Sequence, residues 1–354
     1  RGMKKKNLFR LGSVALVATL IGFFSFACLT SSADAKVYRW KIQSGYPHGD
    51  LSFELLKDFA ASAEKRSNGQ LKITVFADPE IVPLEQLFDA TKRGTLDMLH
   101  AAGAFWGGIV PVGEVEFGIP YGFRVPEAKN FKDSAGIIRK FFFKSGFVDL
   151  LREEYGKQKL YWLDMHTYGP VPFVVATKPI KTCKDLKGVK IRDEGLYTNW
   201  HNMLGARGTY ISGGEAYMAL KLGTLDAAQW DVSCITGLKW HEVAPYWIRG
   251  EENDHCIGHI LVNMKSWNAL PDNLKKALKD AAKDYWDATV KGYGAEIGIV
   301  EDMVKKGTLK ECQLDKDCIN KHAEAAHKLW NEVAGRDPAS AKAIQMIKRW
   351  RGIK

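Results

Sequence analysis

Arg192 is the residue whose type and position point most directly to a ligand. It follows a short apolar strand that we expect at residues 189–191. A guanidinium group holds a carboxylate or a sulfonate through paired, charge-assisted hydrogen bonds. Ligands of open α/β sheets bind at the carboxyl ends of the strands. The sequence therefore predicts that Arg192 binds an acidic ligand. The alternative is a surface arginine that pairs with Asp193 or Glu194.

Motifs of catalysis do not accompany this arginine. The sequence contains no Gly-x-Ser-x-Gly, His-Glu-x-x-His or P-loop pattern. Its nine histidines are scattered, and only His255 and His259 come loosely near the spacing of metal ligands. A binding protein is therefore favoured, and an exported enzyme that acts on small organic acids stays open as the alternative.

Residues 1–35 have the pattern of a secretory signal peptide. Five cations within residues 1–10 precede an apolar run, and the small-residue site Ala-Asp-Ala ends at Ala35. We expect cleavage after Ala35 and a periplasmic location. A membrane anchor is the alternative, but the small-residue site favours cleavage. Lipid attachment at Cys28 is disfavoured because the usual upstream aliphatic residue is missing.

The charge of the remaining chain suits a small anionic partner. Cleavage would remove five of 51 cations and one of 41 acids, so the formal charge would fall from +10 to +6. A mild positive excess favours small anions. The mature part has no run of five basic residues and no nucleic-acid-binding motif, so we expect no nucleic-acid partner.

Five cysteines would remain in a compartment that permits disulfides. A short polar loop separates Cys312 from Cys318, which favours a local bridge between them. A bridge between Cys234 and Cys256 is a second option. The odd number leaves at least one free thiol, and no spacing suits zinc.

Strands and helices alternate in the first part of the mature chain. Hydrophobic periodicity predicts strands at 37–42, 71–76 and 96–99, and helices at 51–65 and 83–93. This β-α-β-α-β order indicates an α/β domain with a largely parallel sheet.

The same unit recurs further along the chain. Gly-Thr-Leu-Asp follows a helix at 94–97 and again at 223–226, which predicts two similar lobes with a ligand cleft between them. Residues 273–305 are expected to form two helices, or one that spans both lobes. The tail is predicted to be helical at 321–332 and 339–350.

The segment that ends at Arg192 resembles a motif of a known family. Residues 185–192, Asp-Leu-Lys-Gly-Val-Lys-Ile-Arg, are similar to the "DLKGLKIR" stretch of the solute-binding proteins of TRAP transporters, the DctP family. Five further segments match family motifs in the same order, at 71–76, 84–97, 118–123, 214–226 and 262–271.

The resemblance implies a two-lobed periplasmic-binding-protein-like α/β fold. Its lobes would be joined by a hinge, with a long helix packed along both. We expect 36–160 to be mainly the first lobe and 161–270 mainly the second. Residues 271–354 would hold the long helix and the C-terminal helices.

The resemblance also implies a function. The protein would be a periplasmic receptor that closes on a small organic anion, held by Arg192, and delivers it to the membrane permease subunits of a TRAP transporter. A ligand-sensing partner of a membrane signalling protein would use the same cleft and stays open.

Two residues after the second Gly-Thr-Leu-Asp are expected near the ligand. Trp230 resembles the version of the motif in members that take 2-oxo or 2-hydroxy acids, so such a monocarboxylate is favoured. A small sulfonate or an aromatic acid stays open. Trp230 offers an apolar wall and one N–H donor. Asp231 can accept a hydrogen bond from the ligand or help to hold a cation.

Two departures from the family pattern narrow the ligand. Residues 169–173 contain no arginine where some members carry a second one, which disfavours a sialic-acid-like ligand. Near Asn253, where metal-assisted members carry a glutamate, this chain has acidic and histidine neighbours. A cation that bridges the ligand therefore stays open, the metal is left unknown, and no other cofactor is expected.

Further candidates for ligand contact come after apparent strands and would face the cleft. They are Tyr46, His48, Phe105, Trp106, His166 and Tyr168.

Overall fold

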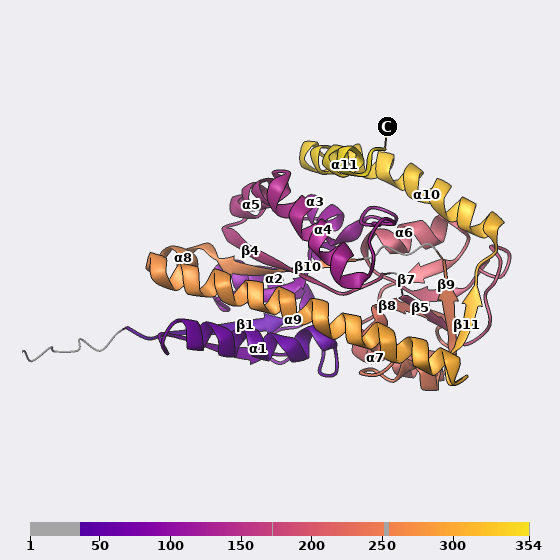
Figure 1. Cartoon of the computed structure of the whole chain (residues 1–354), viewed down its shortest axis with the longest axis horizontal. Coiled ribbons are helices and arrows are strands. Elements are labelled where there is room, and N and C mark those ends of the chain that lie inside the picture. Colours follow the sequence, from indigo (N-terminus) through magenta and orange to yellow (C-terminus); the bar gives the residue numbers. More distant parts are fainter. Residues whose placement is uncertain (1–35, 172, 251–254, 354) are drawn as a thin grey trace, which may run out of the picture. The chain divides into compact units, whose positions relative to one another are not determined.

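The computed structural model describes residues 36–171, 173–250 and 255–353, and it contains two β-sheets with helices around them (Figure 1). The predicted signal peptide at 1–35 and the candidate Asn253 lie outside the described residues. None of the described helices combines the length and the apolar character needed to cross a membrane.

The first sheet has the strand order β2-β1-β3-β10-β4. Its strands are β1 (Tyr38–Ser44), β2 (Leu71–Phe76), β3 (Met98–Ala102), β4 (Leu160–Thr167) and β10 (Ile257–Asn263). Strand β1 pairs in parallel with β2 and β3, while β10 is antiparallel to both β3 and β4. Parallel strands need crossover connections, which α1 (Leu51–Arg66) and α2 (Leu84–Arg93) supply.

The second sheet has the order β11-β9-β5-β8-β6-β7. Its strands are β5 (Phe173–Ala176), β6 (Lys190–Arg192), β7 (Arg207–Thr209), β8 (Ala227–Trp230), β9 (Tyr246–Arg249) and β11 (Lys310–Gln313). Strand β6 is parallel to β7 and β8, and β5 is antiparallel to β8 and β9. Helices α6 (Gly195–Met203) and α7 (Gly213–Lys221) connect the parallel strands.

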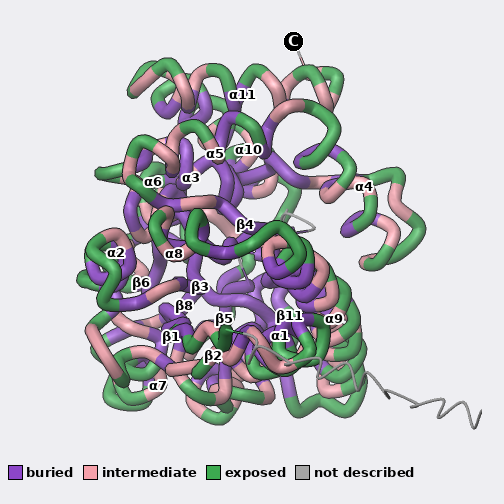
Figure 2. The backbone as a smooth tube through the Cα atoms, turned by 90° about the vertical axis from the view of Figure 1, so that its left-hand side faces the viewer, coloured by how far each residue is buried: buried purple, intermediate pink, exposed green. Residues whose placement is uncertain are grey.

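The remaining helices lie around these sheets. They are η1 (Gly103–Trp106), α3 (Val112–Gly118), α4 (Phe131–Lys144), α5 (Phe147–Lys157), η2 (Val232–Cys234), η3 (Trp240–Glu242), α8 (Met264–Asn268), α9 (Asp272–Lys305), α10 (Lys316–Ala334) and α11 (Pro338–Arg351). Figure 2 shows that the buried residues follow the strands and the inner sides of the helices. Exposed residues follow the outer sides of α7 and α9, as expected for amphipathic helices.

The two Gly-Thr-Leu-Asp segments have equivalent positions in the two sheets. The carboxylate of Asp97 accepts a hydrogen bond from the backbone N–H of Lys41 in β1, at 2.9 Å. The carboxylate of Asp226 accepts one from the backbone N–H of Lys190 in β6, at 3.0 Å. Each aspartate directly precedes a strand of its own sheet: Asp97 precedes β3, and Asp226 precedes β8. The shared role supports the predicted internal repeat.

Helix α9 is a single helix of 34 residues, about 50 Å long at the usual rise per residue. Asp284 accepts a hydrogen bond from Ser62 of α1, beside the first sheet. Glu296 accepts one from Thr236, which follows β8 of the second sheet. The interpretation as one helix along both lobes is therefore confirmed, and the alternative of two helices is wrong.

The chain passes between the two sheets at three places. The first is between β4 and β5, the second between β9 and β10, and the third is α9. Sheet membership therefore does not follow a single division near residue 160, because β4 and β10 belong to the first sheet. The exact lobe boundaries stay a prediction.

The disulfide joins Cys183 to Cys318, with 5.0 Å between their Cα atoms. The predicted bridge between Cys312 and Cys318 is therefore wrong. Cys312 lies in β11 with its side chain in the apolar cluster of the second sheet. Cys318 lies in the first turn of α10 and faces the turn that holds Cys183. Cys312 is free and buried, and so are the other two remaining cysteines, at 234 and 256.

Candidate ligand-binding site

The guanidinium of Arg192 lies in the interior, at the end of the central parallel strand β6. The residue is only 1 % exposed. Its Nε donates to the carbonyl of Ile211 at 3.0 Å, and its Nη1 donates to the carbonyl of Gln229 at 3.0 Å. These carbonyls follow β7 and belong to β8, the two neighbours of β6. The adjoining strands therefore fix the orientation of the guanidinium.

Glu194 provides the third contact of this guanidinium. Nη2 of Arg192 donates to Oε2 of Glu194 at 3.1 Å. The alternative of an arginine paired with a neighbouring acid is thus correct for the pairing, but the pair is buried and not at the surface. Asp193 pairs instead with His201. Burial raises the pKa of Glu194, while the positive charge of Arg192 opposes that rise.

Two aromatic rings flank the guanidinium. Its central carbon lies 4.4 Å from the ring centroid of Trp230 and 5.4 Å from that of Tyr210. Both distances allow a cation–π attraction. A side chain at Gly213 would overlap with the indole of Trp230. Glycine at 213 therefore permits the indole to lie against the start of α7.

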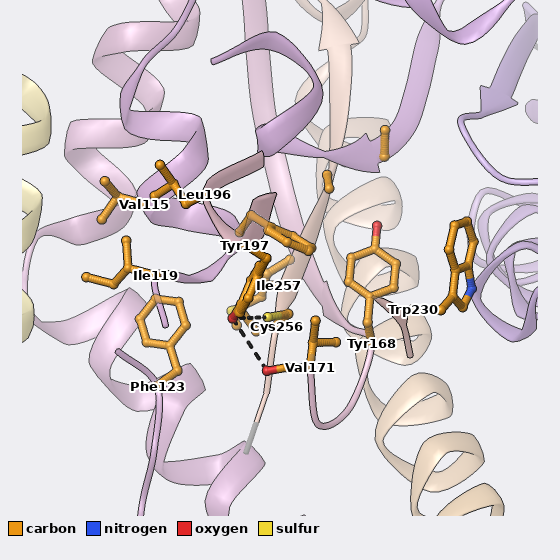
Figure 3. Packing of buried hydrophobic residues seen from close by; sticks show 14 of the residues in the cluster. Val115, Ile119, Phe123, Tyr168, Val171, Leu196, Tyr197, Trp230, Cys256 and Ile257 are labelled. Carbon is orange, nitrogen blue, oxygen red and sulfur yellow. Dashed lines mark hydrogen bonds between the residues drawn. The ribbon is translucent and has the colours of Figure 1, made fainter. Parts of the chain in front are cut away.

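Aromatic rings from segments that follow strands of the first sheet lie next to Trp230, beside the guanidinium of Arg192. The ring of Tyr46, in the loop after β1, lies 5.3 Å from Tyr168, 5.9 Å from Phe105 and 5.9 Å from Trp230. Figure 3 shows Tyr168 and Trp230 at one end of the central apolar cluster. Four of the predicted contact residues therefore come together with Arg192. We call Arg192, Tyr46, Phe105, Tyr168 and Trp230 the arginine–aromatic cluster.

Asp50 links the first sheet to this cluster. It is the N-cap of α1, and one carboxylate oxygen accepts the backbone N–H groups of Ser52 and Phe53. The other oxygen accepts the indole N–H of Trp230 at 3.2 Å. Burial raises the pKa of Asp50. An N-cap aspartate is readable from sequence, but its contact with a tryptophan of the other sheet is not.

Asp231 lies directly after Trp230 and is also buried. One of its oxygens accepts the backbone N–H of Ser233 at 2.7 Å, and the other accepts the hydroxyl of Tyr293 in α9 at 3.1 Å. Burial raises the pKa of Asp231 well above its usual value, and the negative charge of Asp50 raises it further.

His166 lies beside the cluster, in β4. Its ring centroid is 4.5 Å from that of Tyr168 and 4.3 Å from that of His100. Burial lowers the pKa of His100 to about 3 and that of His166 well below its usual value. Both imidazoles are therefore neutral near pH 7 and add no positive charge next to Arg192.

Two sequence candidates lie elsewhere. Trp106 points into the core of the first lobe, where it is 5.2 Å from Phe88 and stacks on His259 at 5.6 Å. The side chain of His48 is 66 % exposed and lies 3.3 Å from a carboxylate oxygen of Glu80. Both residues follow a strand, as predicted, but these contacts are with residues other than Arg192.

Sequence reasoning missed three neighbours of the arginine as site residues. For Asp50, the sequence indicates only that it can cap the start of a helix. Glu194 was considered only as a partner of a surface arginine. Tyr210 follows a strand too short for its periodicity to be read.

Among the described residues, one group of three metal-type donors lies within ligand distance: Cys183, Cys318 and His322. Two of its sulfur atoms are joined in the disulfide, so they are not available as thiolate ligands. This group therefore does not form a metal site in the oxidised protein.

The sequence pattern of the bacterial extracellular solute-binding protein family 7, named DctP, matches residues 43–337. A monocarboxylate 2-oxoacid-binding periplasmic protein of Nostoc is 24% identical over 364 residues, covering 99% of this chain and 94% of that protein. A TRAP periplasmic solute-binding protein of Pseudoalteromonas atlantica, solved with bound sodium and pyruvate, is 25% identical with a TM-score of 0.81, covering 90% of this chain and 94% of that one. One from Colwellia psychrerythraea, solved with calcium and pyruvate, is 25% identical with a TM-score of 0.81, covering 90% and 95%.

The match with the family pattern extends over most of the chain, and the structural similarity is of the same extent. TRAP solute-binding proteins have the two-lobed periplasmic-binding fold, are extracytoplasmic, and work with membrane permease components. The chain belongs to the DctP family of bacterial extracellular solute-binding proteins.

Proposed function

We propose that this protein is the periplasmic receptor of a TRAP-type transporter and that Arg192 holds the acidic group of its ligand. The observation that carries the proposal is the buried guanidinium at the meeting point of aromatic residues from both sheets. The receptor would release the acid to the permease subunits. Export by the signal peptide at 1–35, with Lys36 as the first mature residue, completes the proposal.

A small organic acid is the ligand class that the relatives support. The Nostoc relative is named for monocarboxylate 2-oxoacids, and two similar structures contain pyruvate with a cation. We infer a small acid of this size, with a 2-oxo or 2-hydroxy monocarboxylate first among the candidates. A small sulfonate or an aromatic acid is compatible with the same guanidinium. A cation bound with the acid, as in those structures, is the further option, with Asp231 beside it.

A role in binding without catalysis agrees with the family, whose members are binding proteins. An enzyme acting on small acids would be supported only by turnover of a candidate acid, measured with purified protein.

Ligand binding should change the separation of the two lobes. Arg192, Tyr46 and Tyr168 are all almost fully buried, so a ligand can reach the arginine only when the lobes move apart. A ligand shifts a protein toward the state in which it makes better contacts. We therefore expect small-angle scattering to give a smaller radius of gyration after addition of an acid that raises the melting temperature. An unchanged radius at saturation would contradict closure.

Gly237 gives a test of the closed contact between the lobes. A Cβ atom at Gly237, after η2, would overlap with the carbonyl oxygen of Gly49, in the loop after β1. Overpacking of this kind costs about 1–3 kcal/mol. Gly237→Ala should therefore weaken binding of the acid about tenfold, measured by calorimetric titration. In the control Gly298→Ala, the added Cβ meets open space. Equal affinities in both variants would show that the two loops do not limit closure.

A further inference from the structure

Acidic groups outnumber basic groups around Arg192. Among the described residues of this site, Asp50, Glu194 and Asp231 are buried carboxyl groups, and Arg192 is the only arginine or lysine that contacts them. The donors to Asp50 and Asp231 are backbone N–H groups, hydroxyl groups and an indole, which are all neutral. Neutral donors satisfy hydrogen bonds but supply no positive charge. Without a cation beside it, the ionised form of the buried Asp231 is disfavoured, and its pKa is raised well above its usual value. The nearby imidazole of His166 is neutral as well.

A plain monoanion would increase this imbalance. Its acid group would need the same guanidinium that Glu194 already contacts at 3.1 Å. Two carboxylates that share one guanidinium repel each other, and burial strengthens the repulsion. The guanidinium has five N–H groups, and its three contacts with Ile211, Gln229 and Glu194 account for three of them. Donors for a second acid group therefore exist, but the charge does not balance.

A further observation favours a cationic group in the ligand. The ring centroids of Phe105, Tyr168 and Trp230 each lie within 6 Å of that of Tyr46, so four aromatic rings gather at this site. The faces of aromatic rings attract ammonium groups.

We propose that the ligand is a small zwitterion, which carries a primary or methylated ammonium group beside its carboxylate or sulfonate, and that Glu194 recognises the positive charge. This proposal rests on the proposed function, because Arg192 would hold the acid group. Within the class of small acids, it ranks an acid that also carries an ammonium group above the 2-oxo and 2-hydroxy monocarboxylates. The ammonium group would lie against the aromatic rings and near Glu194. Its charge would offset that of the buried carboxylates, so Glu194 could keep its contact with Arg192.

Matched pairs of acids test the proposal by calorimetric titration. Each pair has the same acid group and differs in an amine or a hydroxyl: taurine with isethionate, and alanine with lactate. Glycine betaine tests the methylated form. All titrations are run with a chelator in sodium-free buffer, and again with added calcium or sodium. We expect the amine-bearing member of a pair to bind about tenfold or more tightly without added metal.

Glu194→Gln isolates the role of the acid. The amide keeps the size of the side chain and removes its charge, so the preference for the amine should fall about tenfold. The matched control is Glu153→Gln, whose side chain is 62 % exposed on α5. It should leave the preference unchanged. Melting curves of both variants report whether they fold, and the preference of the wild-type protein tests the proposal without any variant.

The outcomes separate this proposal from the function itself. Binding of isethionate or lactate in preference to its amine-bearing partner, with or without metal, would overturn the zwitterion. If that binding depended on Arg192, the receptor function would stand. Binding that Arg192→Ala leaves undiminished would instead contradict the proposed function.

Discussion

Replacing Arg192 with alanine should weaken binding of the acidic ligand by about 30-fold to several-thousand-fold. Loss of one partner of a buried, hydrogen-bonded charge pair costs about 2–5 kcal/mol, because the other charge stays buried without its partner. Arg192→Lys should recover only part of the affinity, since an ammonium group keeps the charge but not the planar fork. The measurement is calorimetric titration of both variants with the acid that binds wild-type protein.

The same substitution should also lower stability. Arg192 bonds two carbonyl groups and Glu194 in the interior, and all three would lose their donor. Arg139 supplies the matched control. It forms a two-point ion pair with Asp164, between α4 and β4, at 2.9 and 2.8 Å. Arg139→Ala should lower the melting temperature but keep the ligand affinity.

Comparison of the two arginines separates a binding role from a structural one. Lost affinity in Arg192→Ala, with a melting temperature no lower than that of Arg139→Ala, would support the assignment. Wild-type affinity in Arg192→Ala would contradict it. Lost affinity with collapse of the folded state would indicate that Arg192 is needed for the fold.

Removal of the disulfide should have the largest effect on stability. Cys183 and Cys318 are 135 residues apart, and closing a loop of that length stabilises the folded state by about 5 kcal/mol in the chain-entropy account. Measured values for disulfides more often lie near 2–4 kcal/mol. We therefore expect Cys183→Ser to lower the melting temperature by about 5 °C. Scanning calorimetry measures the shift.

Two controls identify the bridge. Cys312→Ala removes a buried free cysteine and should leave the disulfide intact. A reducing agent should lower the melting temperature of the wild-type protein and of Cys312→Ala, but not that of Cys183→Ser. Peptide mapping without reduction should find Cys183 linked to Cys318. A peptide that links Cys312 to Cys318 would contradict the pairing.

The elements of secondary structure were readable from the sequence because their signals are local. Helix α1 was predicted at 51–65 and spans Leu51–Arg66, and β2 was predicted and found at 71–76. Apolar periodicity, an N-cap and a closing glycine all lie within a few residues of the element that they define. The repeated Gly-Thr-Leu-Asp also indicated two similar halves. In the structure, the aspartate of each copy accepts a hydrogen bond from a backbone N–H group of its own sheet.

The position of Arg192 at the end of a strand was likewise determined by the sequence. The strand β6 was expected at 189–191 and spans Lys190–Arg192. A local pattern gives the end of a strand within a residue or two, and the parallel order of the sheet then directs that end toward the other lobe. The segments that resemble motifs of the DctP family indicated the protein family as well.

Only the tertiary structure decided which residues surround this arginine. Asp50 and Trp230 are 180 residues apart, yet their side chains share a hydrogen bond. Cys318 pairs with Cys183 and not with the nearby Cys312, because β11 turns the latter into the core. Such contacts depend on how two sheets approach each other. The packing of distant apolar surfaces sets that approach, and no local pattern in the sequence encodes it.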